Sequence, residues 1–134
     1  MREHAPVMLT PEEAAALHPS PPVTEGKVRR LRLLAAHENP KIRESVASSY
    51  NTPDDVFVVL ASDPDEGVRA CLARNEAAPC DVLRMLADDR SETVRGWVAV
   101  NYFVPADVME RLANDASRTV RSLVKWKSRL ADAG

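Results

Sequence analysis

Histidine, cysteine and carboxylate side chains are the groups in this 134-residue chain that could catalyse a reaction or bind a metal. The histidines and cysteines form no CxxC, HExxH or similar spacing that would bring ligands around one ion. The carboxylates fall at helix starts or at repeated positions, and the four glycines form no phosphate-binding loop. The sequence therefore predicts a protein that is not an enzyme, with no catalytic residue, no cofactor and no metal site. The histidines and cysteines concerned are His4, His18, His37, Cys71 and Cys80.

The composition predicts one cytoplasmic domain. Hydrophobic residues make up 45% of the chain and aromatic residues only 4%, so small aliphatic side chains must form most of the core. The formal net charge of −2 gives no overall attraction to nucleic acid or to an anionic membrane. The chain has no apolar run of roughly 18 residues, and its first residues lack the pattern of a signal peptide.

An internal repeat of 26 residues is the most informative feature of the sequence. The segment DPDEGVRACLARN at 63–75 recurs as DRSETVRGWVAVN at 89–101. Columns of leucine, proline, and valine or isoleucine followed by arginine continue the same interval over most of the chain. These columns include Leu34, Leu60, Leu86 and Leu112, then Pro53, Pro79 and Pro105, and then Arg43, Arg69, Arg95 and Arg121.

Each repeat is predicted to form two short helices. In the first helix of the segment TPDDVFVVLA at 52–61, Thr52 is expected to cap and Pro53 to occupy the first helical position. The second helix is expected to end near Asn75 and Asn101, residues that tolerate a left-handed cap conformation. It is expected to begin after a capping residue in each copy, namely Asn39, Asp65, Ser91 and Ser117.

Helices this short are marginal alone, because nucleation is costly, and must be stabilised by stacking on neighbouring units. The predicted fold is an all-α, right-handed α-solenoid, a HEAT/armadillo-like superhelix of about three and a half two-helix repeats. Residues 1–33 are expected to form an N-terminal cap segment with a capped helix at 9–17, and residues 34–134 the solenoid. The two parts together are predicted to form a single domain.

The segment LASDPDEGVRACLARNEAAPCDVLRML resembles the leucine-rich repeat variant family, which is similar to HEAT and armadillo repeats. The resemblance covers residues 34–130 and implies alternating short helices, the second either α or 3₁₀. Some members of that family carry an iron–sulfur cluster on N-terminal cysteines. This chain has no cysteine before Cys71, so the resemblance implies no cluster here.

The arginine column Arg43, Arg69, Arg95 and Arg121 allows two interpretations. It could form a phosphate-binding stripe, or it could form a structural ladder of ion pairs with Asp63, Asp89 and Asp115, each six residues before one of the arginines. We favour the ladder, with partners in the same unit or the next. His37 occupies the first aspartate position, so Arg43 is expected to be less well paired. Asn75 and Asn101 are expected to bond turn backbone.

Two basic clusters flank a more acidic middle. They are KVRRLR at 27–32 and RTVRSLVKWKSR at 118–129. Solvated end caps are one interpretation, because terminal repeats of a solenoid need polar outer faces. A surface for nucleic acid or for an acidic protein is the other.

Aromatic residues gather in the last third of the chain, where they either close the terminal core or form an exposed patch. The leading functional hypothesis is a non-enzymatic protein–protein interaction module, a scaffold or adaptor that binds another protein on the concave face. Nucleic-acid binding through the basic ends is the alternative, and self-association is a third hypothesis. The residues predicted to contact the partner are Arg74, Trp97, Tyr102, Phe103 and Trp126, with Tyr102 and Phe103 the more exposed pair.

Overall fold

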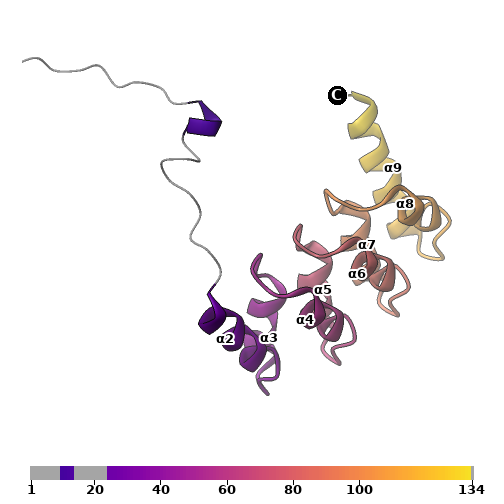
Figure 1. The fold of residues 1–134 in the computed structure, drawn as a ribbon. Helices are drawn as coiled ribbons and strands as arrows, with labels where there is room; N and C mark the ends of the chain where they lie inside the picture. The colour runs from indigo at the N-terminus through magenta and orange to yellow at the C-terminus, as the bar shows by residue number, and fades with distance from the viewer. Residues whose placement is uncertain (1–9, 14–23, 134) are drawn as a thin grey trace, which may run out of the picture.

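The computed structural model describes residues 10–13 and 24–133 and confirms the predicted all-α class. The helices between residues 24 and 133 come in four successive pairs, which follow one another along one direction (Figure 1). Within the row of second helices, α3 packs on α5, α5 on α7 and α7 on α9, as expected of a repeat-like helical array. The pairs are α2 (Glu25–Ala35) with α3 (Pro40–Ala47), α4 (Asp54–Leu60) with α5 (Glu66–Arg74), α6 (Cys80–Leu86) with α7 (Glu92–Val100), and α8 (Ala106–Leu112) with α9 (Arg118–Ala133).

The predicted N-terminal helix at 9–17 lies only partly within the described residues. Residues 11–13 are helical. The Thr10 hydroxyl accepts a hydrogen bond from the Glu13 N–H at 3.1 Å, and the Glu13 carboxylate accepts one from the Thr10 N–H at 3.3 Å. This reciprocal pair is a capping box, so the described residues do form a helix start.

The core is a continuous stripe of small aliphatic side chains contributed by every pair. Phe57, 1% exposed, is the one aromatic residue in this cluster of buried side chains. Because the repeated positions point to the same side of successive helices, each unit covers the apolar face of its neighbour. The buried columns are Val46, Leu72, Val98 and Val124; Leu60, Leu86 and Leu112; and Val56, Val82 and Val108.

The second helices are α-helical and begin after the predicted caps. Asp65 accepts a hydrogen bond from the Val68 N–H at 3.1 Å, and Ser91 and Ser117 cap their helices in the same way. Asn39 accepts instead from the Lys41 N–H, two residues ahead. The predicted start of the first helices was wrong by one residue, since Pro53 is itself the N-cap, with extended backbone and no side-chain cap bond. Thr52 therefore lies outside the helix, and its buried hydroxyl donates to the Val46 carbonyl at 2.8 Å.

α5 and α7 end at the predicted residues, but without a left-handed cap conformation. Asn75 and Asn101 are the C-cap residues, but their φ angles are −75° and −63°, so neither is left-handed. Both are 4% exposed. Their role lies in the side chain, which bonds the backbone of the preceding unit.

Candidate interaction surface

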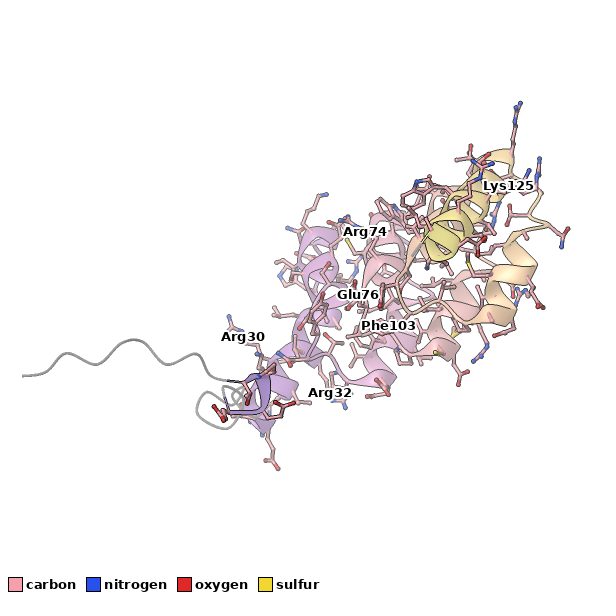
Figure 2. The ribbon with its side chains drawn as sticks, turned by 90° about the horizontal axis from the view of Figure 1, so that it is seen from above. Arg30, Arg32, Arg74, Glu76, Phe103 and Lys125 are labelled. Carbon is pink, nitrogen blue, oxygen red and sulfur yellow. The ribbon has the colours of Figure 1, made fainter. Side chains whose placement is uncertain are left out.

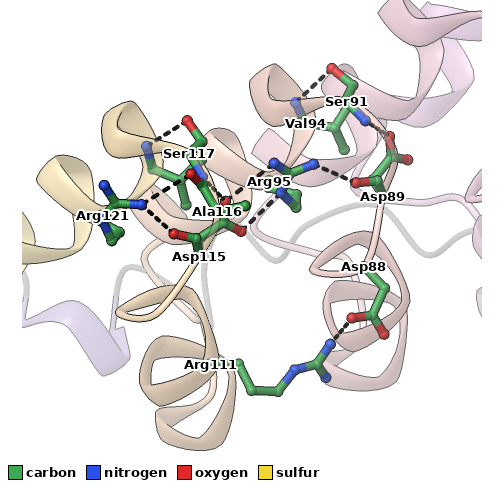
Figure 3. Close-up of polar contacts among 11 residues, drawn as sticks. Asp88, Asp89, Ser91, Val94, Arg95, Arg111, Asp115, Ala116, Ser117 and Arg121 are labelled. Atoms are coloured by element: carbon green, nitrogen blue, oxygen red, sulfur yellow. Dashed lines mark hydrogen bonds and ion pairs between the residues drawn. The ribbon is translucent and has the colours of Figure 1, made fainter.

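Arginine and aspartate side chains tie each unit to the next along the array. The Nε atoms of Arg43, Arg69 and Arg95 lie 2.8, 2.8 and 2.9 Å from an aspartate oxygen in the following unit. Nη1 of each donates to the backbone carbonyl six residues earlier, so that Arg95 joins the Asp89 carbonyl to the Asp115 carboxylate (Figure 3). The guanidinium groups thus serve as structural cross-links between units. The three aspartates are Asp63, Asp89 and Asp115.

The expectation that Arg43 is less well paired was wrong, because the pairing runs forward to the next unit. Arg43 bonds Asp63, and His37 instead accepts the Asn39 N–H through Nδ1 at 3.0 Å. Arg121 is the arginine of this column that has no aspartate partner among the described residues, although its Nη1 still donates to two carbonyl oxygens.

Ionisation of Asp115 is favoured by these contacts. Burial of the carboxyl opposes ionisation, but hydrogen bonds from Arg95 and the Ser117 N–H outweigh that penalty and hold the pKa of Asp115 below its ordinary value. Exposed pairs between first helices, or between a first helix and the turn that follows its neighbour, form a second row of cross-links. The hydrogen bond from Arg84 likewise lowers the pKa of Asp107. The exposed pairs are Arg32–Asp55, Arg84–Asp107 and Arg111–Asp88.

Asparagine side chains make a parallel set of cross-links. The Asn75 amide donates to the Ala47 and Ser49 carbonyls at 2.8 and 3.0 Å. Asn101 repeats this pattern one unit later on Ala73 and Asn75, at 2.8 and 3.1 Å. The amide oxygen of each also accepts a backbone N–H two residues ahead. The predicted bonding of these asparagines to turn backbone is confirmed, and it spans adjacent units.

Lys127 takes the next position of the asparagine column, and its ammonium donates to the Asn101 carbonyl. Burial disfavours the charged form and lowers the pKa of Lys127 from 10.5. In the window between that lowered pKa and 10.5, the unfolded chain binds more protons than the folded one, so stability rises with pH.

We therefore predict that the stability of the natural chain, relative to a Lys127→Gln variant, increases as pH is raised toward 10.5. Glutamine keeps a donor for the Asn101 carbonyl but does not titrate, so the difference isolates the ammonium group. Thermal melts of both proteins at several pH values measure it. A difference that is constant or shrinks over this range would contradict the prediction.

The two basic clusters lie at opposite ends of the array. Arg30 and Arg32 on α2 are at one end and Lys125 on α9 is at the other, as Figure 2 shows. Arg32 also forms an ion pair with Asp55. Sequential stacking of the helix pairs therefore keeps the clusters apart instead of combining them into one basic surface.

All four aromatic side chains predicted to contact a partner are exposed. Tyr102 and Phe103, in the turn after α7, are 76% and 54% exposed, and their rings meet edge to face with centroids 4.9 Å apart. Trp97 and Trp126 are 38% and 52% exposed. The interpretation that these residues close the terminal core is wrong, because α9 already covers α7 with Val120 and Val124.

Trp97 and Trp126 line one groove between α7 and α9, with a volume of about 640 Å³. Gly96 is buried at the base of this groove, and a Cβ atom there would lie 3.1 Å from Leu123 Cδ1, so the missing side chain lets Leu123 of α9 approach the α7 backbone. The other lining residues are Glu92, Thr93, Val100 and Thr119.

A smaller cavity of about 140 Å³ adjoins the groove and shares Trp97 and Val100 with it. Arg74 and Tyr102 line this cavity, and the Arg74 guanidinium carbon lies 4.6 Å from the centroid of the Trp97 ring. The structure therefore brings Arg74, Trp97, Tyr102 and Trp126 onto neighbouring cavities, with Phe103 against Tyr102. We name this region the α7–α9 surface.

Sequence reasoning missed Glu92, Thr119 and Leu123 as parts of the groove. The signal was present on α9, where Thr119, Leu123 and Trp126 follow the spacing of one helical stripe. Their exposure depends on how far α9 stands from α7, which the spacing alone does not give.

Metal-binding clusters and membrane-spanning helices are absent from the described part of the chain. Residues 10–13 and 24–133 contain no group of three or more histidine, cysteine or carboxylate side chains placed to hold a metal. None of the helices in those ranges has the length and hydropathy needed to cross a membrane. Comparison with protein-family models, with curated proteins and with solved structures finds no match for this chain.

Proposed function

We propose that this chain is a non-enzymatic protein–protein interaction module, in which the α7–α9 surface of a right-handed α-solenoid docks another protein. We also propose that the chain belongs to the same class of repeat proteins as the leucine-rich repeat variant family. In this class the second helices would form the concave side of the solenoid. The groove between Trp97 and Trp126 supports it most directly, because exposed aromatic anchors beside a preformed apolar groove are typical of binding surfaces.

The distribution of exposed groups along the second helices also supports this choice of surface. The exposed residues of α3 are polar, whereas α7 and α9 expose two indole rings and the apolar Leu130. Arg74 and the Tyr102–Phe103 pair extend the same surface beyond the groove. Arginine, tyrosine and tryptophan are the residue types that contribute most to binding free energy at protein interfaces.

We expect Trp126→Ala and Phe103→Ala each to reduce capture of the partner by about tenfold, the loss typical of aromatic anchors. The measurement is quantitative affinity capture from a lysate of the cells that make the protein. Tyr50→Ala is the matched control, because Tyr50 occupies the position of Tyr102 two units earlier and is 69% exposed, away from the groove. Equal yields from the natural chain and both aromatic variants would refute the choice of surface.

A further inference from the structure

Glu92 is the only ionisable residue among the described ones that line the groove between α7 and α9. Within the described ranges it enters no ion pair. Its counterpart one unit earlier, Glu66, is held by a hydrogen bond from the Ser91 hydroxyl, and the structure has no corresponding bond between Glu92 and Ser117. The groove therefore presents a carboxylate that is not occupied by a neighbouring unit.

The indole rings of Trp97 and Trp126 add a second attraction for positive charge. The face of an indole ring attracts a cation within about 6 Å of its centre. The Trp97 ring already has a cation of this chain over it, since the Arg74 guanidinium carbon lies 4.6 Å from the ring centroid. Trp126 has no such partner in the described structure, so its ring is the one free to receive a further cation.

The remaining lining suits the stem of a long basic side chain. The side chains of Val100 and Leu123 and the Cα atom of Gly96 are apolar, and only the hydroxyls of Thr93 and Thr119 interrupt them. Lysine and arginine bury their methylene stems on apolar surfaces while the charged head keeps polar contacts. An acidic side chain in the groove would instead be repelled by the Glu92 carboxylate, and the groove lining has no cation to offset that repulsion.

From this combination we propose that the groove takes an arginine or lysine side chain of another protein. The inference rests on the proposed function and names the chemistry of the partner at that same site. The stem lies along Val100 and Leu123, and the charged head lies between Trp126 and the Glu92 carboxylate. The basic residues of α9 lie outside the groove lining and leave the groove itself open to a cation; they are Arg118, Arg121, Lys125, Lys127 and Arg129.

The chain offers a direct probe, because Trp97 and Trp126 are its only two tryptophans. Both indole N–H signals in a ¹⁵N–¹H correlation spectrum therefore report on the groove. The probes are end-blocked pentapeptides of alanine with arginine, lysine, norleucine or glutamate at the centre. We expect the arginine and lysine peptides to shift the indole signals with saturation at millimolar concentrations, and the norleucine and glutamate peptides to have much weaker effects.

Variants identify the groups responsible. Glu92→Gln and Trp126→Leu are each expected to weaken binding of the arginine peptide about three- to fivefold. This is the range expected for loss of an exposed ion pair or cation–π contact. Glu110→Gln is the matched control, because it removes an exposed acid from α8 outside the groove. Circular dichroism establishes that the variants fold.

Several outcomes would overturn the inference. If the glutamate peptide binds as well as the arginine peptide, the groove prefers no cation, and if the norleucine peptide does so, the groove binds apolar side chains only. If no peptide shifts the indole signals, the groove does not bind a cation. Indole shifts that depend on protein concentration alone would identify a second copy of this chain as the occupant. If capture still requires Trp126 while the arginine peptide fails, the interaction surface stands and only the cation inference falls.

Discussion

Replacement of Arg69 by alanine is expected to lower the free energy of unfolding by about 3–5 kcal/mol. The Arg69 and Asp89 side chains are 5% and 6% exposed, and their ion pair joins the second and third helix pairs. Loss of the guanidinium leaves the Asp89 carboxylate buried without its cation and the Asp63 carbonyl without its donor. Because domains of this size have a total stability of roughly 5–15 kcal/mol, the array is expected to come close to unfolding.

Urea denaturation followed by circular dichroism measures this loss, provided that the slope with denaturant is unchanged. Arg121→Ala is the matched control, since Arg121 also donates to the carbonyl six residues earlier, and to that of Ala116, but has no aspartate partner among the described residues. Its effect is expected to be clearly smaller. Replacing Arg69 by methionine together with Asp89 by leucine should recover most of the stability, because no buried charge is left unpaired. An equal loss in the Arg69 and Arg121 variants would contradict this account.

Replacement of Asn101 by alanine is expected to lower the free energy of unfolding by about 2–4 kcal/mol. The side chain makes three hydrogen bonds, two as donor to carbonyls of the preceding unit and one as acceptor from the Phe103 N–H. Alanine leaves the Ala73 carbonyl and the Phe103 N–H without these partners, which costs more than the hydrogen bonds contribute net, whereas the Asn75 carbonyl keeps the Ala78 N–H. Asn101→Asp is expected to be at least as destabilising at neutral pH, because a carboxylate would face the two carbonyl oxygens.

The same urea titration tests this prediction. Asn114→Ala is the control of the same residue type, since Asn114 is exposed and its side chain makes one bond, to the Glu110 carbonyl at 3.3 Å. Its effect is expected to stay within about 0.5 kcal/mol, as for most surface substitutions. A loss in the Asn101 variant no larger than in the Asn114 variant would show that the buried asparagine does not join the units.

Both predictions concern polar contacts between units, where the sequence left the choice of partner open. Aspartates stand six residues before and twenty residues after Arg69, and these two positions belong to the same column of the repeat. The local sequence pattern therefore cannot tell which of the two aspartates pairs with Arg69. The structure selects the later one for each paired arginine, because the next unit stacks close enough for the carboxylate to reach the guanidinium.

The helices themselves were largely predictable. A period of 26 residues, aliphatic side chains at helical spacing and the capping residues of the second helices are local signals, and they gave the helix pairs, the second-helix starts and the core columns. The start of α4 was misplaced by one residue because a proline fits both the N-cap and the first helical position.

What the sequence by itself determined is therefore the all-α array, since each repeat contains its own helix signals and an apolar face that needs a neighbour. The tertiary structure alone decided the offset between neighbouring units, and that offset sets which charges pair and which aromatic rings stay exposed. The groove between Trp97 and Trp126 lies where α9 packs on α7, and Gly96 there lets Leu123 approach the α7 backbone. Distance between two helices comes from packing along the whole interface, so no short stretch of sequence could specify it.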